Sequence, residues 1–271
     1  MKVSIVTNAY NQAKYLEATV ESVLNQDWPD IEYFVVDPGS KDDTARLIER
    51  LQTRHPGRFI LCTEPDRGPA DGLNKAFAKA TGDLFFYLNG DDLLLPGAIA
   101  AAVKSALAHP GAAAIYADGY LCDAEGRIIR RAVSTGFSPW RFVHSGAFIL
   151  QQSTFYRADA FRAVGGFNPE NGTSWDIEIL LEMALRGMKL KRVRGYWSMF
   201  RMHPGSITVS QRLAEESRRH HLRYFVRVTG RTRKTQLDRI THHLVRWGSR
   251  VLEPRASVIR LIDASRRLAR A

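Results

Sequence analysis

Short apolar runs alternate with segments of helical periodicity over the first ninety residues, and this alternation constrains the fold more than any other feature of the sequence. Within the longer segments, apolar residues recur every three or four positions, as they do on one face of a helix. Strands that alternate with helices form a parallel sheet. The expected strands are 3–7, 33–36, 59–62 and 84–88, and the expected helices are 13–24, 42–54 and 69–80.

The pattern becomes less regular after residue 89, although it still contains helices and strands. The sequence 123–126, Asp-Ala-Glu-Gly, is typical of the turn of a hairpin. Two short strands are expected on either side of Arg194 and Gly195. The other expected elements are a helix over 96–108, a strand over 112–117, a hairpin over 118–133, a strand at 155–157, a helix from Ala158 and a helix over 175–186.

Length and composition exclude several classes of protein. A chain of 271 residues with 45% apolar and 25% charged residues can bury a full α/β core, unlike a disordered chain. Its two cysteines, Cys62 and Cys122, stand sixty residues apart, which favours neither a disulfide framework nor a cysteine zinc site. The absence of a signal peptide and of a long apolar run predicts a cytoplasmic protein that does not span a membrane.

The positive charge is confined to one end of the chain. Residues 207–271 contain 16 Arg and Lys against 5 Asp and Glu, so the whole formal charge of +11 lies there. Two parts are therefore expected, a body over 1–206 and a basic tail over 207–271. Gly230 and Pro254 divide the tail into about three helices, and each has an apolar stripe: Leu222, Phe225 and Val226; Ile240, Leu244, Trp247 and Val251; Val258, Leu261 and Ile262.

An amphipathic basic helix has three candidate partners. It can pack on the body, pair with a second copy of the chain in a homodimer, or lie on an anionic membrane surface. The third alternative predicts a peripheral protein at the inner face of the membrane. The strongly basic composition also permits nucleic-acid binding, but the charge lies outside the α/β body and the tail contains no recognised binding motif, so no nucleic-acid partner is expected.

Polar residues follow four consecutive strands of the expected sheet. Ligands of open parallel sheets bind beyond the carboxyl ends of the strands, so these residues mark the expected site. They are Thr7, Asn8 and Tyr10 after the first strand, Asp37 after the second, Glu64, Asp66 and Arg67 after the third, and Asn89, Asp91 and Asp92 after the fourth.

The site lacks the glycine-rich phosphate loops of the common nucleotide-binding motifs. A diphosphate can then be held through Mg²⁺ or Mn²⁺, which takes one or two protein carboxylates and completes its shell with phosphate oxygens and water. Asp91 and Asp92 are the predicted metal ligands. The alternative is that they only cap the helix that begins near Pro96.

Asp37 is predicted to bind a base. Its carboxylate only accepts hydrogen bonds, so it suits a base edge with an N–H group, as in uracil, thymine or guanine but not cytosine. Its alternative role, capping the next helix, is already available to Asp42 and Asp43. Arg67 is placed to meet a phosphate or a base carbonyl, or else is a solvated loop charge.

These residues belong to seven sequence blocks in a fixed order, and with them the body resembles the family 2 inverting glycosyltransferases of the GT-A fold. The resemblance implies an open mixed α/β sheet with helices on both faces, here followed by a basic helical C-terminal tail. The blocks are 3–7 with Tyr10 and Asn11; 35–40 with Asp43 and Thr44; 64–68 with Asp71, Asn74 and 80–83; 88–92; 165–167; 175–176; and 201–204.

The resemblance also implies roles for the nucleotide-binding residues. Asp37 would read the base, with Thr7 and Arg67 beside it, and Asn8 and Tyr10 would complete the nucleotide site. Asn89 stands at the first position of the family's DxD motif, which is usually assigned to the ribose. Asp91 stands at the second, the usual metal ligand. Asparagine at 89 leaves one negative charge fewer than a strict DxD.

Asp176 matches the position of the family's catalytic base. In-line displacement needs one carboxylate beside the acceptor hydroxyl, opposite the leaving diphosphate. Glu178 is nearby, but two residues along a helix it faces elsewhere, so Asp176 is the predicted base. The alternative is that Asp176 only caps the helix 177–186.

Three further predictions concern the rest of the site. His203 matches a position near the metal or diphosphate, with an exposed loop histidine as the alternative. Gln151 and Gln152 match the region that lines the donor sugar and the acceptor. Trp175 suits stacking on a sugar face, or is part of the core.

The implied function is an inverting transfer of a sugar from a nucleoside diphosphate donor, with UDP or dTDP favoured, to the hydroxyl of a glycan or a lipid-linked acceptor. The pathway implied is cell-surface polysaccharide or glycolipid synthesis. A nucleotidyltransferase shares the metal site and the sheet edge, but it would need a basic glycine-rich loop in place of residues 9–12. A catalytically inactive sugar-binding protein is the remaining alternative.

Overall fold

The computed structural model describes residues 1–144, 147–206, 210, 213–252 and 259. Within these ranges, nine strands form one mixed sheet in the order β3-β2-β1-β4-β8-β6-β9-β5, with β7 paired to β6. The strands are β1 (Val3–Asn8), β2 (Ile31–Val36), β3 (Ile60–Cys62), β4 (Leu84–Asn89), β5 (Leu93–Leu94), β6 (Ala112–Cys122), β7 (Ile128–Ala132), β8 (Thr154–Arg157) and β9 (Lys189–Arg201).

The first half of the sheet is parallel, as expected. β1 pairs with β2 and β4, and β2 pairs with β3. In this register Asn8 lies opposite both Val36 and Asn89, so the ends of β1, β2 and β4 are level. The residues that follow these strands therefore meet at one edge of the sheet.

The second half is mostly antiparallel and differs from the sequence-based expectation in one strand. The two short strands predicted around Arg194 and Gly195 are one continuous strand, β9, which pairs in parallel with β6. Gly195 has φ 143°, and a Cβ there would lie 2.9 Å from Trp197 Nε1. Glycine thus allows the strand to continue through an irregular stretch of pairing with β6.

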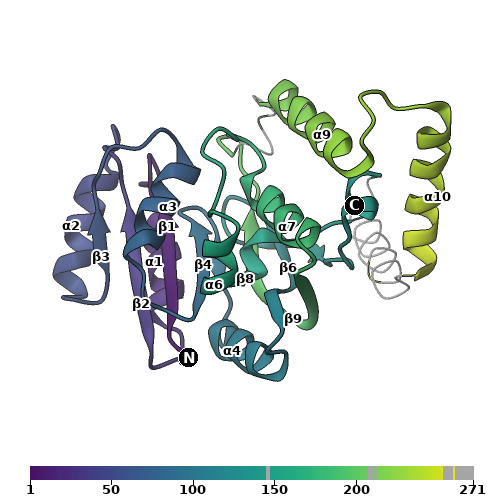
Figure 1. Cartoon of the computed structure of the whole chain (residues 1–271). Coiled ribbons are helices and arrows are strands. Elements are labelled where there is room, and N and C mark those ends of the chain that lie inside the picture. Colours follow the sequence, from purple (N-terminus) through teal and green to yellow (C-terminus); the bar gives the residue numbers. More distant parts are fainter. Residues whose placement is uncertain (145–146, 207–209, 211–212, 253–258, 260–271) are drawn as a thin grey trace, which may run out of the picture.

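Helices cover both faces of the sheet, which confirms the predicted fold class (Figure 1). One hydrophobic cluster joins α1, α2 and α4 to one face, and a second joins α3, α6 and α7 to the other. Along β4, Phe86 belongs to the first cluster and Phe85 to the second, as the alternation of side chains along a strand requires. The helices are α1 (Leu16–Leu24), α2 (Thr44–Arg54), α3 (Pro69–Lys79), α4 (Ala98–Ala108), α5 (Pro139–Val143), η1 (Gln151–Ser153), α6 (Ala158–Ala163), α7 (Trp175–Leu185), α9 (Ala214–Thr229) and α10 (Gln236–Leu252).

The first helix after residue 206 packs on the body. Tyr224 and Phe225 of α9 form a hydrophobic cluster with Val143 of α5 and Leu181 of α7. The predicted stripe of this helix is therefore wrong at Leu222, whose side chain is 46% exposed. The predicted division at residue 206 places α9 in the tail, whereas α5 and α7, which share this cluster with it, belong to the body.

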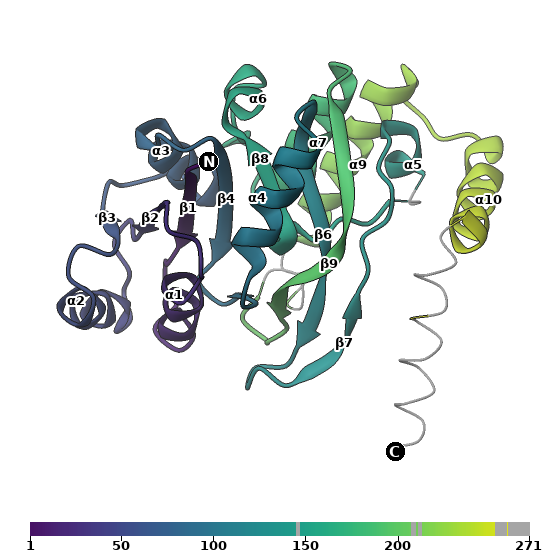
Figure 2. The same cartoon turned by 90° about the horizontal axis from the view of Figure 1, so that it is seen from below.

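α10 lies at the opposite end of the molecule from α2 (Figure 1, Figure 2). Ile240 and Leu244 of the predicted stripe are exposed, as is Leu237 on the same side of the helix. The side chains of the predicted stripe members Trp247 and Val251 are not described, and the third stripe and the division at Pro254 lie outside the described residues. Within the described ranges no helix has both the length and the apolarity needed to cross a bilayer.

Candidate active site

A cavity of about 530 Å³ opens at the edge of the sheet where β1 and β4 end. Its walls come from the turn after β1, the turn at the end of β4, η1 with the residues before it, the first turn of α7, and the strands β6, β7 and β9. The cavity brings together eight of the predicted site residues: Asn8, Tyr10, Asn89, Asp91, Gln151, Gln152, Trp175 and Asp176.

The turn after β4 carries the acidic pair and is held by the neighbouring elements. Thr19 of α1 donates its hydroxyl hydrogen to the carbonyl oxygens of Gly90 (2.9 Å) and Asp92 (2.8 Å). A Cβ at Gly90 would lie 2.7 Å from the Asn8 carbonyl oxygen, so only glycine allows β1 and this turn to approach so closely. The position of Asp91 and Asp92 is therefore set by both β1 and α1.

Asp91 pairs with His203, which lies 112 residues further along the chain. Asp91 Oδ2 is 2.9 Å from His203 Nε2, and both side chains are about one-tenth exposed. The imidazole also packs against Tyr15, with ring centroids 4.6 Å apart. The predicted metal ligands Asp91 and His203 are thus adjacent, and both residues keep some access to solvent.

The spacing of these two atoms suits a divalent ion. Two ligands at right angles on an octahedral ion, each about 2.1 Å from it, lie about 3 Å apart. Within the described residues no group of three or more His, Cys, Asp or Glu side chains is arranged to hold a metal ion. Asp91 and His203 would therefore need oxygens from a diphosphate and water to complete the shell, which is the usual arrangement for metals bound with nucleotides.

Asp92 faces the interior and is unsuited to the metal-binding role predicted for it. Its side chain is fully buried. Oδ1 accepts from the backbone N–H of Arg201 (2.9 Å), and Oδ2 accepts from Gln152 Nε2 (2.8 Å) and Asn89 Nδ2 (3.3 Å). Burial and the nearby Asp91 charge raise the pKa of Asp92 well above its ordinary value. These contacts favour a role in orienting Gln152 and Asn89.

Arg201, to which no role was assigned from the sequence, holds the acidic turn in place. Its buried guanidinium donates from Nε to the Asp91 carbonyl oxygen (2.8 Å) and from Nη1 to the Ala124 carbonyl oxygen (2.8 Å). The guanidinium also stacks over Tyr15, 4.9 Å from the ring centroid. Arg201 belongs to the block 201–204, one of the seven that carry the family resemblance. Only the pairing of β9 with the rest of the sheet shows that Arg201 reaches Asp91.

Asp176 lies in the first turn of α7 and lines the cavity. Burial raises the pKa of its carboxyl group to about 6, while the backbone N–H groups of Asp176 and Ile177 act in the opposite direction. A carboxylate with a pKa in this range is a stronger base than an ordinary aspartate and is still ionised at neutral pH.

Glu178 is bound by two asparagine side chains of the preceding loop. Its Oε2 accepts from Asn171 Nδ2 (2.6 Å), and both carboxylate oxygens accept from Asn168 Nδ2 (3.1 and 3.3 Å). Glu178 is absent from the cavity lining, whereas Asp176 is part of it. These contacts agree with the choice of Asp176 over Glu178.

The two glutamines are buried beside the cavity. Gln151 Nε2 donates to the Tyr87 carbonyl oxygen (2.9 Å), but its Oε1 has no hydrogen-bond partner among the described residues. Asn8 Nδ2 is buried and equally unpartnered in this part of the chain. Polar atoms left in this state cost about 1–3 kcal/mol each, so a polar ligand that paired with them would be favoured.

The remaining predicted residues of the cavity contribute in different ways. Trp175 is 7% exposed and belongs to the hydrophobic cluster around α3, α6 and α7, so most of the indole is core. Tyr10 is 48% exposed at the cavity. Asn89 donates to Asp92 and also lines the cavity.

Thr7, Asp37 and Arg67 do not line the cavity. The Thr7 side chain is fully buried and its hydroxyl oxygen accepts from the Tyr33 hydroxyl (2.9 Å), so the contact with a base predicted for it is not available. Asp37 Oδ1 accepts from the backbone N–H and the hydroxyl of Ser40, whereas Oδ2 has no hydrogen bond within the described chain. Arg67 is exposed and pairs with Asp71 and Glu170.

The sequence model of glycosyl transferase family 2 matches residues 4–164. Chondroitin synthase from Escherichia coli is 30% identical over 186 residues, which cover 67% of this chain and 26% of that protein. GalNAc(5)-diNAcBac-PP-undecaprenol beta-1,3-glucosyltransferase from Campylobacter jejuni is 29% identical over 136 residues, 50% of this chain and 43% of that protein. The chain thus spans less than half the length of either relative.

Two solved structures share the fold. TarS from S. aureus in complex with UDP-GlcNAc has a TM-score of 0.65 at 17% identity and covers 91% of this chain and 70% of its own. Mannosyltransferase PcManGT from Pyrobaculum calidifontis, in complex with GDP-Man and Mn²⁺, has a TM-score of 0.64 at 19% identity and covers 97% of this chain and 75% of its own. The chain is a GT-A-type protein that belongs to glycosyl transferase family 2.

Proposed function

We propose that the chain transfers a sugar from a nucleoside diphosphate donor to an acceptor hydroxyl with inversion at the anomeric carbon. One observation carries the proposal: Asp91 of the turn after β4 and Asp176 of α7 line the same cavity, and Asp91 pairs with His203 of the loop after β9. Such a site separates a group that holds the leaving diphosphate from a group that activates the acceptor.

The donor would lie along the carboxyl edge of the sheet. The free oxygen of Asp37 can accept from a ring N–H of uracil, thymine or guanine, and we favour a UDP or dTDP donor. Asn8 Nδ2 and Gln151 Oε1, both unpartnered, are placed to pair with the ribose, phosphates or sugar. Their unmet hydrogen bonds support a polar ligand in this cavity.

Asp91 and His203 would hold a divalent ion. When bound, this ion would neutralise charge on the departing diphosphate, so that no protein acid need protonate it. The imidazole nitrogen is less suited to Mg²⁺ than to Mn²⁺, so we favour Mn²⁺. Arg201 fixes the main chain of Asp91 and thereby the distance between Asp91 and His203.

Asp176 would remove the proton from the acceptor hydroxyl. Among the described residues, Asp91 and Asp176 are the acidic residues of the cavity lining, and Asp91 is engaged by His203. This leaves one carboxylate for the acceptor, which is what a single displacement with inversion requires. A retaining double displacement would require a further carboxylate as nucleophile.

The acceptor would be a glycan or a lipid-linked saccharide of cell-surface polysaccharide or glycolipid synthesis. The cavity has an apolar wall suited to the C–H face of a sugar ring, formed by Leu121, Leu150, Phe200 and Met202. The similarity to a chondroitin synthase and to an undecaprenol-linked glucosyltransferase supports this class of acceptor.

A thermal-shift screen tests the donor. We expect a UDP-, dTDP- or GDP-sugar with Mn²⁺ to raise the melting temperature by about 5 °C at about 100 times its Kd, because a ligand that binds only the folded state stabilises it. Omitting Mn²⁺ should remove most of the rise. A CDP-sugar is the matched control, since cytosine has no ring N–H for Asp37, and an equal shift with it would contradict the role of Asp37.

We also propose that α10 rests on an anionic membrane surface. Leu237, Ile240 and Leu244 lie on one side of this helix and are all more than half exposed. The tail that contains α10 carries the whole excess positive charge of the chain. Apolar side chains can enter the lipid interface while the basic residues, each worth about 1 kcal/mol, meet anionic headgroups.

The triple variant Leu237→Ser, Ile240→Ser, Leu244→Ser tests this surface. We expect at least a tenfold lower partition onto phosphatidylglycerol vesicles, because about 1.5 kcal/mol of transfer free energy is lost for each side chain. Leu107→Ser on α4, a residue 63% exposed, is the matched control. Unchanged vesicle binding of the triple variant would contradict membrane attachment. If vesicle binding is unchanged and the variant also loses a dimer seen in gel filtration, the result would favour a homodimer.

A further inference from the structure

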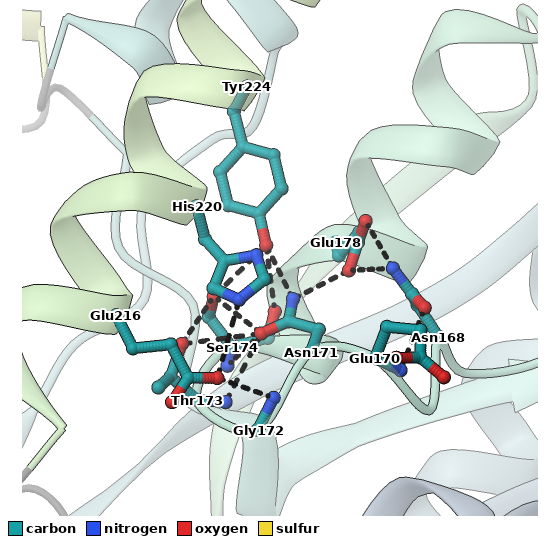
Figure 3. Close-up of polar contacts among 10 residues, drawn as sticks. All are labelled: Asn168, Glu170, Asn171, Gly172, Thr173, Ser174, Glu178, Glu216, His220 and Tyr224. Atoms are coloured by element: carbon teal, nitrogen blue, oxygen red, sulfur yellow. Dashed lines mark hydrogen bonds and ion pairs between the residues drawn. The ribbon is translucent and has the colours of Figure 1, made fainter.

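The loop that precedes α7 is bonded to α9 by a network of polar contacts (Figure 3). We call residues 168–174 the base loop, because Trp175 and Asp176 follow it directly. Thr173 of this loop lines the cavity. The base loop and α9 both lie outside residues 4–164, which the family model matches. Neither the fold nor the proposed reaction accounts for the contacts between them.

Asn171 is the centre of the network. Its side chain is fully buried. Oδ1 accepts from the backbone N–H groups of Thr173 (3.2 Å) and Ser174 (3.0 Å), and Nδ2 donates to Glu178 Oε2 (2.6 Å) and to the Tyr224 hydroxyl (2.7 Å). One amide therefore links the base loop, α7 and α9 (Figure 3).

α9 contacts the base loop at two points that lie about two helical turns apart. The Tyr224 hydroxyl meets Asn171 and lies 3.0 Å from Ser174 Oγ. Glu216 Oε1 accepts from the backbone N–H of Gly172 at 3.1 Å. A Cβ at Gly172 would lie 2.9 Å from the same carboxylate oxygen, so the glycine permits this close approach. Two separated contacts fix the loop against rotation as well as displacement.

The hydroxyl of Tyr224 is not needed for packing. The aromatic ring already belongs to the cluster with Val143, Leu181 and Phe225, where phenylalanine would fill the same space. Among the described residues, the hydroxyl forms its hydrogen bonds with the base loop, with Asn171 and with the side chain and carbonyl oxygen of Ser174. The hydroxyl therefore stabilises the base loop and not the packing of the ring, and its partners indicate its role.

We propose that α9 clamps the base loop and that Tyr224 and Glu216 are positioning residues for Asp176. This inference rests on the proposed role of Asp176 as the base. Asp176 follows the loop by two residues, and its side chain can reach an acceptor hydroxyl only while the first turn of α7 stays in place. The basic tail is then divided in function: α9 belongs to the active site, and α10 is the surface helix.

Two variants of the full chain test the clamp. In Tyr224→Phe the ring stays, Asn171 keeps its bond to Glu178, and Ser174 Oγ keeps its contact with Asn171, so the protein should fold. Glu216→Ala removes the second contact. The matched control is Arg227→Gln, which breaks the 2.6 Å pair between α9 and Glu182 of α7 without touching the base loop.

Hydrogen exchange measured by mass spectrometry tests the clamp without any ligand, because it reports how often the base loop opens. We expect the amides of residues 172–174 to exchange about 2- to 10-fold faster in both variants, the change that losing one hydrogen bond of about 0.5–1.5 kcal/mol produces. The control should match the wild type. Unchanged exchange in both clamp variants would overturn the proposal.

The rate of nucleoside diphosphate release tests whether α9 positions Asp176. With the donor that gives the largest thermal shift, we expect about tenfold lower kcat in Tyr224→Phe while KM for the donor stays within about twofold, because base geometry but not donor binding is disturbed. The acidic limb of the pH profile should move below pH 6, since a looser loop admits water to Asp176.

The outcomes separate this inference from the proposed function. Faster exchange with unchanged kcat and pH profile would overturn the positioning role and leave α9 as packing only. An active Asp176→Asn variant would instead contradict the proposed base, whatever the clamp variants do. The proposal is supported if the clamp variants show both a lower kcat and faster exchange while Arg227→Gln shows neither change.

Discussion

Replacing Asp176 with asparagine is expected to slow nucleoside diphosphate release by about 10²- to 10⁴-fold, the range that loss of a general base typically produces. Asparagine keeps the size and the acceptor oxygen of aspartate but cannot take a proton. Donor binding, measured by thermal shift with Mn²⁺, should stay unchanged because Asp91, His203 and Asp37 are untouched. The loss should therefore appear in kcat and not in KM for the donor.

The wild-type protein should show the corresponding pH dependence. Burial raises the pKa of Asp176 to about 6, so the rate should fall about tenfold for each pH unit below that value as the base becomes protonated. An acidic limb centred near pH 4 would mean that Asp176 is as exposed to water as an ordinary aspartate.

The same substitution should stabilise the protein at neutral pH. In the unfolded chain Asp176 ionises near pH 3.9, so between about pH 4 and 6 the folded state holds a proton that the unfolded state has lost. The free energy of unfolding thus falls as pH rises through this window. Because water reaches the cavity, we expect Asp176→Asn to recover about 1–2 kcal/mol, or about 2–5 °C in melting temperature, at pH 7.5 and nothing at pH 4.

Asp159→Asn is the matched control, since Asp159 also lies in the first turn of a helix but is exposed and away from the cavity. It should change neither rate nor the pH profile. A variant at Asp176 that keeps more than about a tenth of the wild-type rate would contradict its role as the base.

Replacing Asp91 with asparagine is expected to abolish the Mn²⁺-dependent part of nucleotide binding and to lower the rate by at least about 10²-fold. The amide keeps a hydrogen bond to His203 but loses the negative charge that a divalent ion requires. Titration calorimetry of the nucleoside diphosphate with and without Mn²⁺ measures the effect directly.

Asp92→Asn provides the contrast to this experiment. Both Asp92 oxygens accept hydrogen bonds from the protein, so its amide nitrogen would face a donor such as Arg201 N–H or Gln152 Nε2. We expect a lower melting temperature with the Mn²⁺ effect retained. The reverse result, loss of the Mn²⁺ effect in Asp92→Asn but not in Asp91→Asn, would show that the two carboxylates have been assigned the wrong roles.

The parallel half of the sheet can be predicted from sequence because each of its elements is defined locally. β4, expected over 84–88, spans Leu84–Asn89, and α2, expected from 42, begins at Thr44. In each strand-helix unit of this half, the apolar periodicity, the turn and the start of the helix all lie within about ten residues of one another. The strand ends and their polar residues follow from the same local pattern.

The antiparallel half is less predictable since its pairings join distant segments. β9 pairs with β6 over a separation of nearly eighty residues, and no local pattern shows that Gly195 lies inside a strand. Leu222 illustrates a second limit. Helical periodicity identifies a stripe, but α9 buries the neighbouring face with Tyr224 and His220 because α5 and α7 lie there.

In the site, residue types were easier to predict than side-chain directions. Asp91 and Asp176 lie at the cavity and His203 pairs with Asp91, whereas Thr7 and Asp92 face the interior. Alternation along a strand places Asn8 at the cavity and Thr7 beneath it, a difference of one residue. Asn171 and Tyr224 lie in a loop and a tail helix, where neither periodicity nor a motif indicates their contact.

The place of β9 in the sheet determines when, during synthesis, the site around Asp91 can be completed. β9 lies between β6 and β5, so β5 stays unpaired until a strand made about a hundred residues later arrives. The same late strand brings Arg201 and His203 to Asp91. If Asp91 and His203 hold a metal-bound diphosphate as proposed, a chain still emerging from the ribosome would lack His203 and Arg201 and could not bind the donor through this pair.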